Sequence, residues 1–384
     1  MALRQARISK APSTFSHVRG YRALRLLILT TGFAGGLLAS TAGRAVAAAP
    51  VELPDLLSTQ APAAMTPLSA LGLERPATTT PELQLASHQS SGSAGKGSGL
   101  GWKSGAACHS AGFDSWRGRT SDAHNKFSGK DNFRSVVKLM QGSWLRQFSN
   151  KPGVFSLGLA LLTNDTRGKF GDCNAGKFDG YFKDIGKALK SHGLGDAIIR
   201  LGWEANGSGF PWFAGKQPDA YKECFRRQVK NLKSQAPGLK IEWTMRKDSA
   251  LGYSVEKIYP GNDVVDIVGL LYYDRWPNVH SDKEWQAAAN EKKNGGPKGI
   301  NTYLQFAKSK GKKLAVPEWA ISDGHNDRSS KDNPFFIEKM FQFFKSNAGS
   351  IAYETYFNCE PASAYKLYPS HYNPKAAAKY QQLW

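Results

Sequence analysis

Residues 197–207 read Ala-Ile-Ile-Arg-Leu-Gly-Trp-Glu-Ala-Asn-Gly, an apolar run that closes on a glutamate, Glu204. A second apolar run, Lys-Leu-Ala-Val-Pro-Glu-Trp at 313–319, places Glu318 at its end in the same way. Short continuous apolar runs are typical of buried strands in a parallel sheet. Each of these two strands is therefore predicted to end in a carboxylic acid.

Six further runs of this kind alternate with longer segments of helical period, such as 133–148, 178–192, 220–234, 300–310 and 335–346. Strands that alternate with helices indicate a parallel sheet, and eight of them in about 280 residues fit a closed (β/α)8 TIM barrel. The alternative is an open doubly wound sheet, which usually carries a glycine-rich turn after its first strand, and none is present. The predicted strands are 106–109, 122–127, 154–162, 197–204, 240–245, 264–273, 313–318 and 351–358.

Catalytic groups of such barrels lie at the carboxyl ends of the strands, where Glu204 and Glu318 stand in the fourth and seventh. Strand alternation predicts Glu204 on the face of Arg200 and Glu318 on the face of Leu314 and Val316. If that face is the barrel interior, both carboxyl groups project into the mouth of the barrel. A salt bridge or a helix cap is the alternative for either residue taken alone.

Two carboxyl groups across a polar cleft are what cleavage of a glycosidic bond requires, one protonated and one ionised. Aromatic side chains, whose faces stack on sugar rings, cluster near the same strand ends. Packing in the core is the alternative for each of them. The candidates are Trp203, Trp212, Trp276, Trp319, Tyr272, Tyr273 and Tyr356.

The run Arg-Leu-Gly-Trp-Glu-Ala-Asn-Gly at 200–207, followed by Phe-Pro-Trp at 210–212, resembles glycoside hydrolase family 26 of clan A. Val-Asp-Ile-Val-Gly at 265–269, followed by Tyr273, is similar to the sixth strand of that family. The resemblance spans roughly residues 102–384 and implies a (β/α)8 catalytic domain, predicted here over 101–384.

The resemblance also implies a retaining double displacement with Glu204 as acid/base and Glu318 as nucleophile. Tyr273 would donate a hydrogen bond to the nucleophile, and Asn206, Trp203 and Trp212 would line the cleft. Arg200 is also expected to bind the substrate.

At three places the chain departs from the family pattern: Trp203 replaces the usual His, Leu271 an Asp, and Pro317 and Trp319 flank the nucleophile. The reaction class survives these departures, but the usual mannan specificity does not follow. Endo action on a polysaccharide is the predicted activity, and a catalytically silent barrel that only binds polysaccharide is the alternative.

The N-terminal segment resembles a secretory signal peptide, predicted over residues 1–49. Six basic residues precede an apolar run at 26–40, and small residues at 45–49 fit a cleavage site. An uncleaved anchor is the alternative. Residues 50–100 are rich in Pro, Ala, Ser, Thr and Gly and are predicted to be a disordered linker. A periplasmic or secreted protein without stable membrane insertion after cleavage is therefore expected.

The chain has four cysteines, none at C-x-x-C spacing, so the sequence predicts neither a zinc site nor another cofactor. An exported chain with an even count favours two disulfides, although four buried thiols are possible. If the barrel closes, its last strand lies beside the first, so that Cys108 and Cys359 could meet. Cys173 and Cys224 would then form the other pair.

The chain is strongly basic, with a formal charge of +20. After residue 100, 42 Lys and Arg face 27 Asp and Glu, so the charge belongs to the barrel. No nucleic-acid motif and no G-x-S-x-G elbow are present, and a monomer without nucleic-acid partners is expected. The charge indicates either a solvated basic surface or attraction to an acidic exopolysaccharide, with Arg246, Lys247 and Arg275 as candidate groove cations.

Overall fold

The computed structural model describes residues 97–108, 112–275, 277–321, 330–359 and 365–384. The predicted signal peptide and the linker up to residue 96 lie outside these residues. Residues 97–100 belong to the barrel unit, because the backbone N–H and the hydroxyl of Ser98 both lie 3.1 Å from Asp122 Oδ2 as donors. The barrel unit therefore includes at least four residues before the predicted boundary at residue 101.

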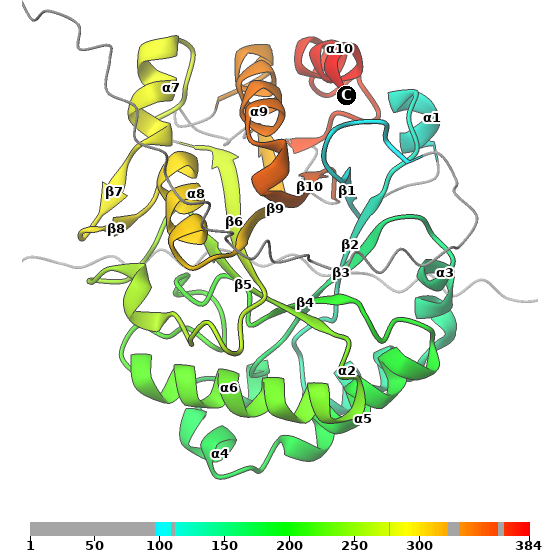
Figure 1. Ribbon diagram of the computed structural model, residues 1–384, viewed down its shortest axis with the longest axis vertical. Helices are drawn as coiled ribbons and strands as arrows, with labels where there is room; N and C mark the ends of the chain where they lie inside the picture. The colour runs from blue at the N-terminus through cyan, green and yellow to red at the C-terminus, as the bar shows by residue number, and fades with distance from the viewer. Residues whose placement is uncertain (1–96, 109–111, 276, 322–329, 360–364) are drawn as a thin grey trace, which may run out of the picture. The chain divides into compact units, whose positions relative to one another are not determined.

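Eight parallel strands close into a barrel, with β10 paired to β1, which confirms the predicted (β/α)8 architecture over the open sheet (Figure 1). Every predicted strand is present, with one or both ends moved by up to three residues. The barrel strands in chain order are β1 (Ser104–Ala107), β2 (Ala123–Phe127), β3 (Val154–Leu159), β4 (Ile198–Leu201), β5 (Lys240–Arg246), β6 (Ile267–Asp274), β9 (Lys313–Ile321) and β10 (Ile351–Phe357).

Helices surround the barrel, and the five predicted helical segments are all present. The segment 133–148 is broken, because the extended backbone of Gly142 ends its first helix. The helices are α1 (Phe113–Arg117), α2 (Phe133–Gln141), α3 (Arg146–Ser149), α4 (Phe170–Asn174), α5 (Asp179–Ser191), α6 (Pro218–Gln235), α7 (Asp282–Ala289), α8 (Ile300–Ser309), α9 (Pro334–Ser346) and α10 (Pro374–Leu383), with a small hairpin of β7 (Lys292–Lys293) and β8 (Gly296–Pro297). Within the described residues, none of these helices combines the length and apolarity needed to cross a membrane.

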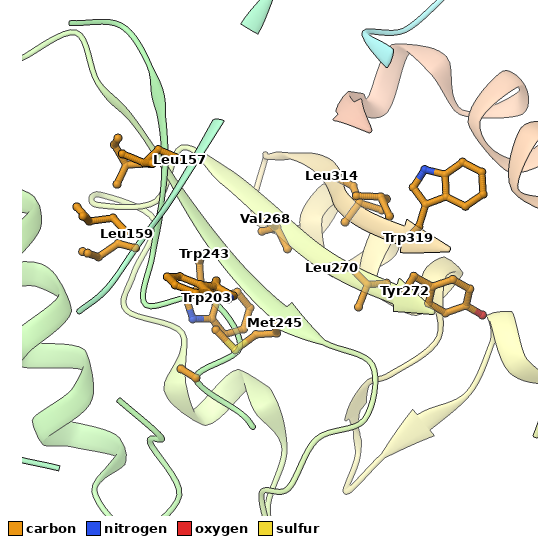
Figure 2. Close-up of a cluster of buried hydrophobic side chains, with 14 of the residues drawn as sticks. Leu157, Leu159, Trp203, Trp243, Met245, Val268, Leu270, Tyr272, Leu314 and Trp319 are labelled. Atoms are coloured by element: carbon orange, nitrogen blue, oxygen red, sulfur yellow. The ribbon is translucent and has the colours of Figure 1, made fainter. Parts of the chain in front are cut away.

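Alternate residues of the strands pack outward against the helices. Figure 2 shows side chains of this outer layer, with Leu157 and Leu159 on β3 and Val268 and Leu270 on β6. All four are fully buried, and burying such a side chain stabilises the fold by about 1.5–3 kcal/mol. This outer layer is the main hydrophobic core of the molecule.

A second, small apolar cluster of Ala123, Ile198, Ala315 and Tyr353 lies inside the barrel. Its members come from β2, β4, β9 and β10, and β4 pairs with neither β9 nor β10, so the contacts must cross the interior. Buried polar side chains occupy other inward positions, among them Asn125, Arg200, Glu242 and Thr355. The barrel interior therefore becomes polar where the site forms.

A β-bulge in β9 changes which side chains face inward. Gly269 of β6 pairs with Ala315, but Leu271 already pairs with Glu318, so β9 carries one extra residue between these pairs. Glu318 therefore shares the interior with Ala315. The predicted alternation was wrong here, because Leu314 and Val316 belong to the outer core.

Both cysteine pairs expected from barrel closure are confirmed. Cys108 follows β1 and joins Cys359 after β10, with 5.0 Å between the Cα atoms. Cys173 on α4 joins Cys224 on α6, with 5.5 Å between the Cα atoms. The first disulfide ties the two ends of the barrel together where β10 meets β1.

Candidate active site

A cavity of about 440 Å³ opens at the carboxyl ends of the barrel strands. The ends of β2, β5, β6, β9 and β10 contribute side chains to it, and the loops after β2, β4, β6 and β10 contribute the others. Active sites of (β/α)8 enzymes form at this end of the barrel. Its lining residues are Phe127, Gly129, Lys130, Trp203, Glu204, Phe210, Arg246, Tyr273, Arg275, Glu318, Phe357 and Tyr365.

Glu204 enters the cavity from a turn and not from a strand. β4 ends at Leu201, and both Gly202 and Glu204 have a φ of 55°. The turn is fixed because the Glu204 N–H donates to the carbonyl of Thr244 over 2.9 Å. A left-handed conformation costs a residue such as Glu about 1–3 kcal/mol, and strained residues of this kind cluster at active sites.

The carboxyl group of Glu204 is mostly buried, with 15% of its side chain exposed. Its Oε2 lies 3.7 Å from Arg246 Nη1. Burial and the nearby Glu318 raise the pKa of Glu204 to about 7, against the opposing effect of Arg246, Arg275 and Arg200. Glu204 can therefore hold a proton near neutral pH.

Glu318 receives a hydrogen bond on each carboxyl oxygen. Arg200 Nη1 donates to Oε1 over 2.6 Å, and the Tyr273 hydroxyl donates to Oε2 over 3.0 Å. Burial raises the pKa of Glu318, while Arg200 and Tyr273 oppose that rise. Because Arg200 keeps its charge and both bonds favour an anion, the proton shared by the pair belongs on Glu204.

Asn125 and Thr355 hold the bulge that turns Glu318 inward. Asn125 Nδ2 donates to the carbonyl oxygen of Pro317 over 2.6 Å, and the Thr355 hydroxyl donates to the same oxygen. Asn125 Oδ1 also accepts from Arg200 Nη2. One buried amide thus connects the backbone before Glu318 with the guanidinium that binds its carboxylate.

Aromatic side chains form two groups at the cavity. Trp203 lines the cavity, and Phe127 and Phe210 lie at ring-centroid distances of 5.6 Å from it. Tyr273 and Tyr365 form the second group, with 5.4 Å between their centroids. These rings can offer apolar faces to a sugar.

Several predicted site residues lie away from the cavity, among them Arg200, which is fully buried and binds Glu318, so the prediction that it binds substrate needs correction. Trp212 is fully buried behind Trp203 and donates from Nε1 to its carbonyl over 2.7 Å. Asn206 binds the backbone of Arg246 through Nδ2 at 2.7 Å and Oδ1 at 3.0 Å. Both residues support cavity-lining neighbours, so the prediction that they line the cleft themselves needs correction.

Tyr272, Trp319 and Tyr356 also need correction, because they face the outer core. Tyr272 stacks on Phe336 of α9, and Trp319 Nε1 donates to Glu354 over 2.6 Å. Tyr272 and Trp319 each directly neighbour an inward residue, so strand alternation turns them outward. The Tyr356 hydroxyl donates to the carbonyl of Tyr365. Trp276 lies outside the described residues.

Of the three predicted groove cations, Arg246 and Arg275 line the cavity and Lys247 does not. Lys247 is 5% exposed, with Nζ 4.9 Å from the ring centroid of Tyr272. Sequence reasoning missed Lys130 and Tyr365, which lie in loops without a recognisable motif. It could have found Phe127 and Phe357, because Phe127 closes one predicted strand and Phe357 lies one residue before the end of another. Among the described residues, no group of His, Cys, Asp and Glu could hold a metal ion.

Residues 183–342, which include Glu204 and Glu318, match the family model described as glycosyl hydrolase family 26. A search of curated proteins finds no match. Solved structures with a similar fold include a modular endo-β-1,4-mannanase from Cellulomonas fimi, with 18% identity and a TM-score of 0.52 over 72% of this chain and 70% of that one.

The catalytic domain of a GH26 endo-β-1,4-mannanase from Bacillus sp. JAMB-750 has 16% identity and a TM-score of 0.51, covering 74% of this chain and 86% of that one. GH26C from Muricauda sp. MAR_2010_75 has 15% identity and a TM-score of 0.50, covering 67% and 78%. At these identities the solved structures show the fold, and the family model carries the resemblance of the sequence. The chain is a glycoside hydrolase on a (β/α)8 barrel, most like glycosyl hydrolase family 26.

Proposed function

We propose that this chain is a retaining endo-β-glycoside hydrolase that cleaves a polysaccharide, with Glu204 as acid/base and Glu318 as nucleophile. The observation that carries the proposal is the unequal environment of two carboxyl groups at one cavity. Glu318 accepts bonds from Arg200 and Tyr273, whereas burial raises the pKa of Glu204 to about 7. Unequal environments of this kind assign acid and nucleophile in glycosidases.

In the first step, a carboxylate oxygen of Glu318 attacks the anomeric carbon and forms an ester bond to it. The glycosidic C–O bond breaks, and Glu204 gives its proton to the leaving oxygen. The Tyr273 and Arg200 hydrogen bonds keep Glu318 ionised and fix its direction of attack.

In the second step, a water molecule attacks the anomeric carbon and gives a proton to Glu204. The ester bond to Glu318 breaks, so that Glu318 leaves as carboxylate and the sugar keeps its anomeric configuration. In the free enzyme the negative charge of Glu318 raises the pKa of Glu204, and esterification removes that charge. The pKa of Glu204 should therefore fall in the intermediate, which suits its change from acid to base.

A polysaccharide substrate and endo action are supported by the similar structures, two of which are described as endo-β-1,4-mannanases. Trp203 offers an aromatic face for a sugar unit beside Glu204. Because Trp203 stands where the family usually has His, mannan itself does not follow. Arg246 and Arg275, which line the cavity, support an acidic exopolysaccharide as the substrate class.

Export to the periplasm or the medium is part of the proposal, with a monomer as the working unit. The sequence pattern of residues 1–49 and the two disulfides support it, because disulfides persist in oxidising compartments.

The proposal is tested by incubating the purified protein with β-mannan, β-glucan, xylan and acidic exopolysaccharides and following the new reducing ends by proton NMR. The proposal predicts a product with the anomeric configuration of the substrate. Glu204→Gln and Glu318→Gln should each lower kcat by several orders of magnitude, while Glu338→Gln, an exposed control on α9 that pairs with Lys379, should not. Inverted product, binding without cleavage, or near-normal activity of either active-site variant would contradict it.

A further inference from the structure

The candidate active site holds more positive than negative groups. Lys130, Arg246 and Arg275 line the cavity together with Glu204 and Glu318. Arg200 lies beneath and already pairs with Glu318, and the raised pKa of Glu204 leaves that group partly uncharged at neutral pH. A neutral glycan needs no such excess of cations.

Two of these cations have no carboxylate partner in the part of the chain that the structure describes. Arg246 lies 3.7 Å from Glu204, but neither Lys130 nor Arg275 is within 4.0 Å of a described carboxylate oxygen. Cations in a cavity usually pair with acids of the protein when their role is structural. The unpaired cations therefore point to an anionic ligand.

Arg275 is held in place by three neighbouring groups. Its guanidinium carbon lies 4.9 Å from the ring centroid of Tyr273, and Nη2 donates to the Tyr365 hydroxyl over 3.3 Å. The preceding residue, Asp274, is 2% exposed and accepts from Asn333 Nδ2 over 2.8 Å, which fixes the end of β6. Arg275 is thus positioned before any ligand arrives.

Among the described residues, most of the hydrogen-bonding capacity of Arg275 is unused. A guanidinium has five N–H donors, and the side chain uses one of them on Tyr365 within the described residues. The planar fork of Arg matches a carboxylate, with which it forms two parallel charge-assisted hydrogen bonds. Tyr273 contacts both Arg275 and Glu318, so a group bound by Arg275 would lie close to the point of cleavage.

We propose that Arg275, assisted by Lys130, binds the carboxylate of a uronic acid unit, so that the substrate is a β-linked acidic polysaccharide. This inference rests on the proposed function and adds the substrate class to it. Two of the similar structures are described as mannanases, which act on a neutral polysaccharide. Arg275 instead points to an acidic sugar as the substrate of this chain.

Matched pairs of substrates test the inference. Hexamers of β-1,4-linked mannuronate and of β-1,4-linked glucuronate are compared with their carboxyl-reduced forms, which keep the same linkages and lose only the charge. Hydrolysis is measured with the wild type. Binding is measured by calorimetry with Glu318→Gln, because this variant should bind the hexamer without cleaving it. The inference predicts preference for the acidic member in at least one pair, decreasing as salt rises.

Variants then assign the preference to Arg275. Arg275→Gln should weaken binding of the acidic hexamer about 10- to 100-fold, the range of a lost charge-assisted pair, and leave the neutral hexamer nearly unchanged. Lys130→Gln should act in the same direction with a smaller loss. Arg226→Gln is the matched control, because it removes one charge from α6, where Arg226 pairs with Asp263 over 2.6 Å. If Arg275→Gln does not fold, Tyr365→Phe removes the bond that holds Arg275 and should give a smaller selective loss.

Equal or tighter binding of the neutral hexamer in both pairs overturns the inference. Equal losses for both members in Arg275→Gln do so as well, because they assign Arg275 a structural role. Selective binding of an acidic hexamer without hydrolysis by the wild type instead refutes the proposed function and leaves the acidic binding site in place.

Discussion

Asn125 is predicted to act on catalysis without touching the substrate, and Asn125→Ala tests this. The side chain is buried and is not among those lining the cavity. Its amide nitrogen binds the carbonyl of Pro317, and its oxygen accepts from Arg200 Nη2. The amide nitrogen also donates to the Thr355 hydroxyl over 3.3 Å. The substitution removes all three bonds and leaves the Pro317 carbonyl with the Thr355 hydroxyl alone.

The size of the effect follows from what Arg200 retains. Within the described chain, Arg200 Nε already makes no hydrogen bond, so Asn125→Ala leaves only the bond from Nη1 to Glu318. An unsatisfied buried donor on a charged group costs about 3 kcal/mol. For a domain of about 280 residues, with about 2.1 cal/mol/K of unfolding entropy per residue, the thermal midpoint should fall by about 5 °C. Displacement of Glu318 by a fraction of an ångström should lower kcat about 10- to 100-fold, with KM little changed.

Ser156→Ala is the matched control. Ser156 is fully buried in the same barrel interior and its hydroxyl lies 2.6 Å from that of Tyr353, so its loss destabilises the barrel without reaching the bulge. Both variants are assayed for kcat and KM at a temperature where each is folded. If Asn125→Ala retains the kcat of Ser156→Ala, the bulge does not depend on Asn125 and the reasoning fails.

Three further predictions concern pH and stability. First, kcat/KM should fall as the pH rises through about 7, where Glu204 loses the proton that it must donate. Arg246→Gln should shift this fall to higher pH, because Arg246 lowers the pKa of Glu204, and Arg226→Gln should not shift it. An unchanged pH profile in Arg246→Gln would refute the assignment. Second, burial raises the pKa of Glu242 from 4.5 to about 7. The contribution of the protonated Glu242 to the free energy of unfolding is therefore fully present below pH 4.5 and is lost as the pH rises through 7. Glu242→Gln should therefore gain about 3 kcal/mol on the wild type between pH 4.5 and 8.5 in urea unfolding, and a constant difference would reject the shift. Third, replacing Cys173 and Cys224 by Ala opens a loop with a sequence separation of 51 and should cost about 4 kcal/mol of unfolding free energy; an unchanged midpoint would speak against a formed disulfide.

The fold could be predicted because its signals are local. Each barrel strand is a short apolar run, and the order of runs and helical segments determines a closed parallel barrel. Closure then predicts which cysteines meet, as the bond between Cys108 and Cys359 confirms. The helices α7 and α10 were missed, because their helical period is weak beside the five stronger segments.

The site could be predicted only in part, because its geometry depends on departures from regular structure. Glu204 reaches the cavity through a left-handed turn, and Glu318 through a bulge at Pro317. A shift of one residue reverses the face of a strand, which is why Leu314 and Val316 were placed on the wrong side. Lys130 and Tyr365 come from loops, where sequence pattern does not determine direction.

The central claim is that Glu318 forms the covalent bond to the sugar. Glu204→Gln slows release of the intermediate, so it should accumulate glycosyl-enzyme from a dinitrophenyl β-glycoside of the cleaved disaccharide, whose leaving group needs no acid. Mass spectrometry of the digested protein measures where the sugar is attached. The account predicts one glycosyl group on the peptide that contains Glu318, absent from Glu204→Gln/Glu318→Gln. A sugar on another residue, or no adduct together with an inverted product, would contradict it.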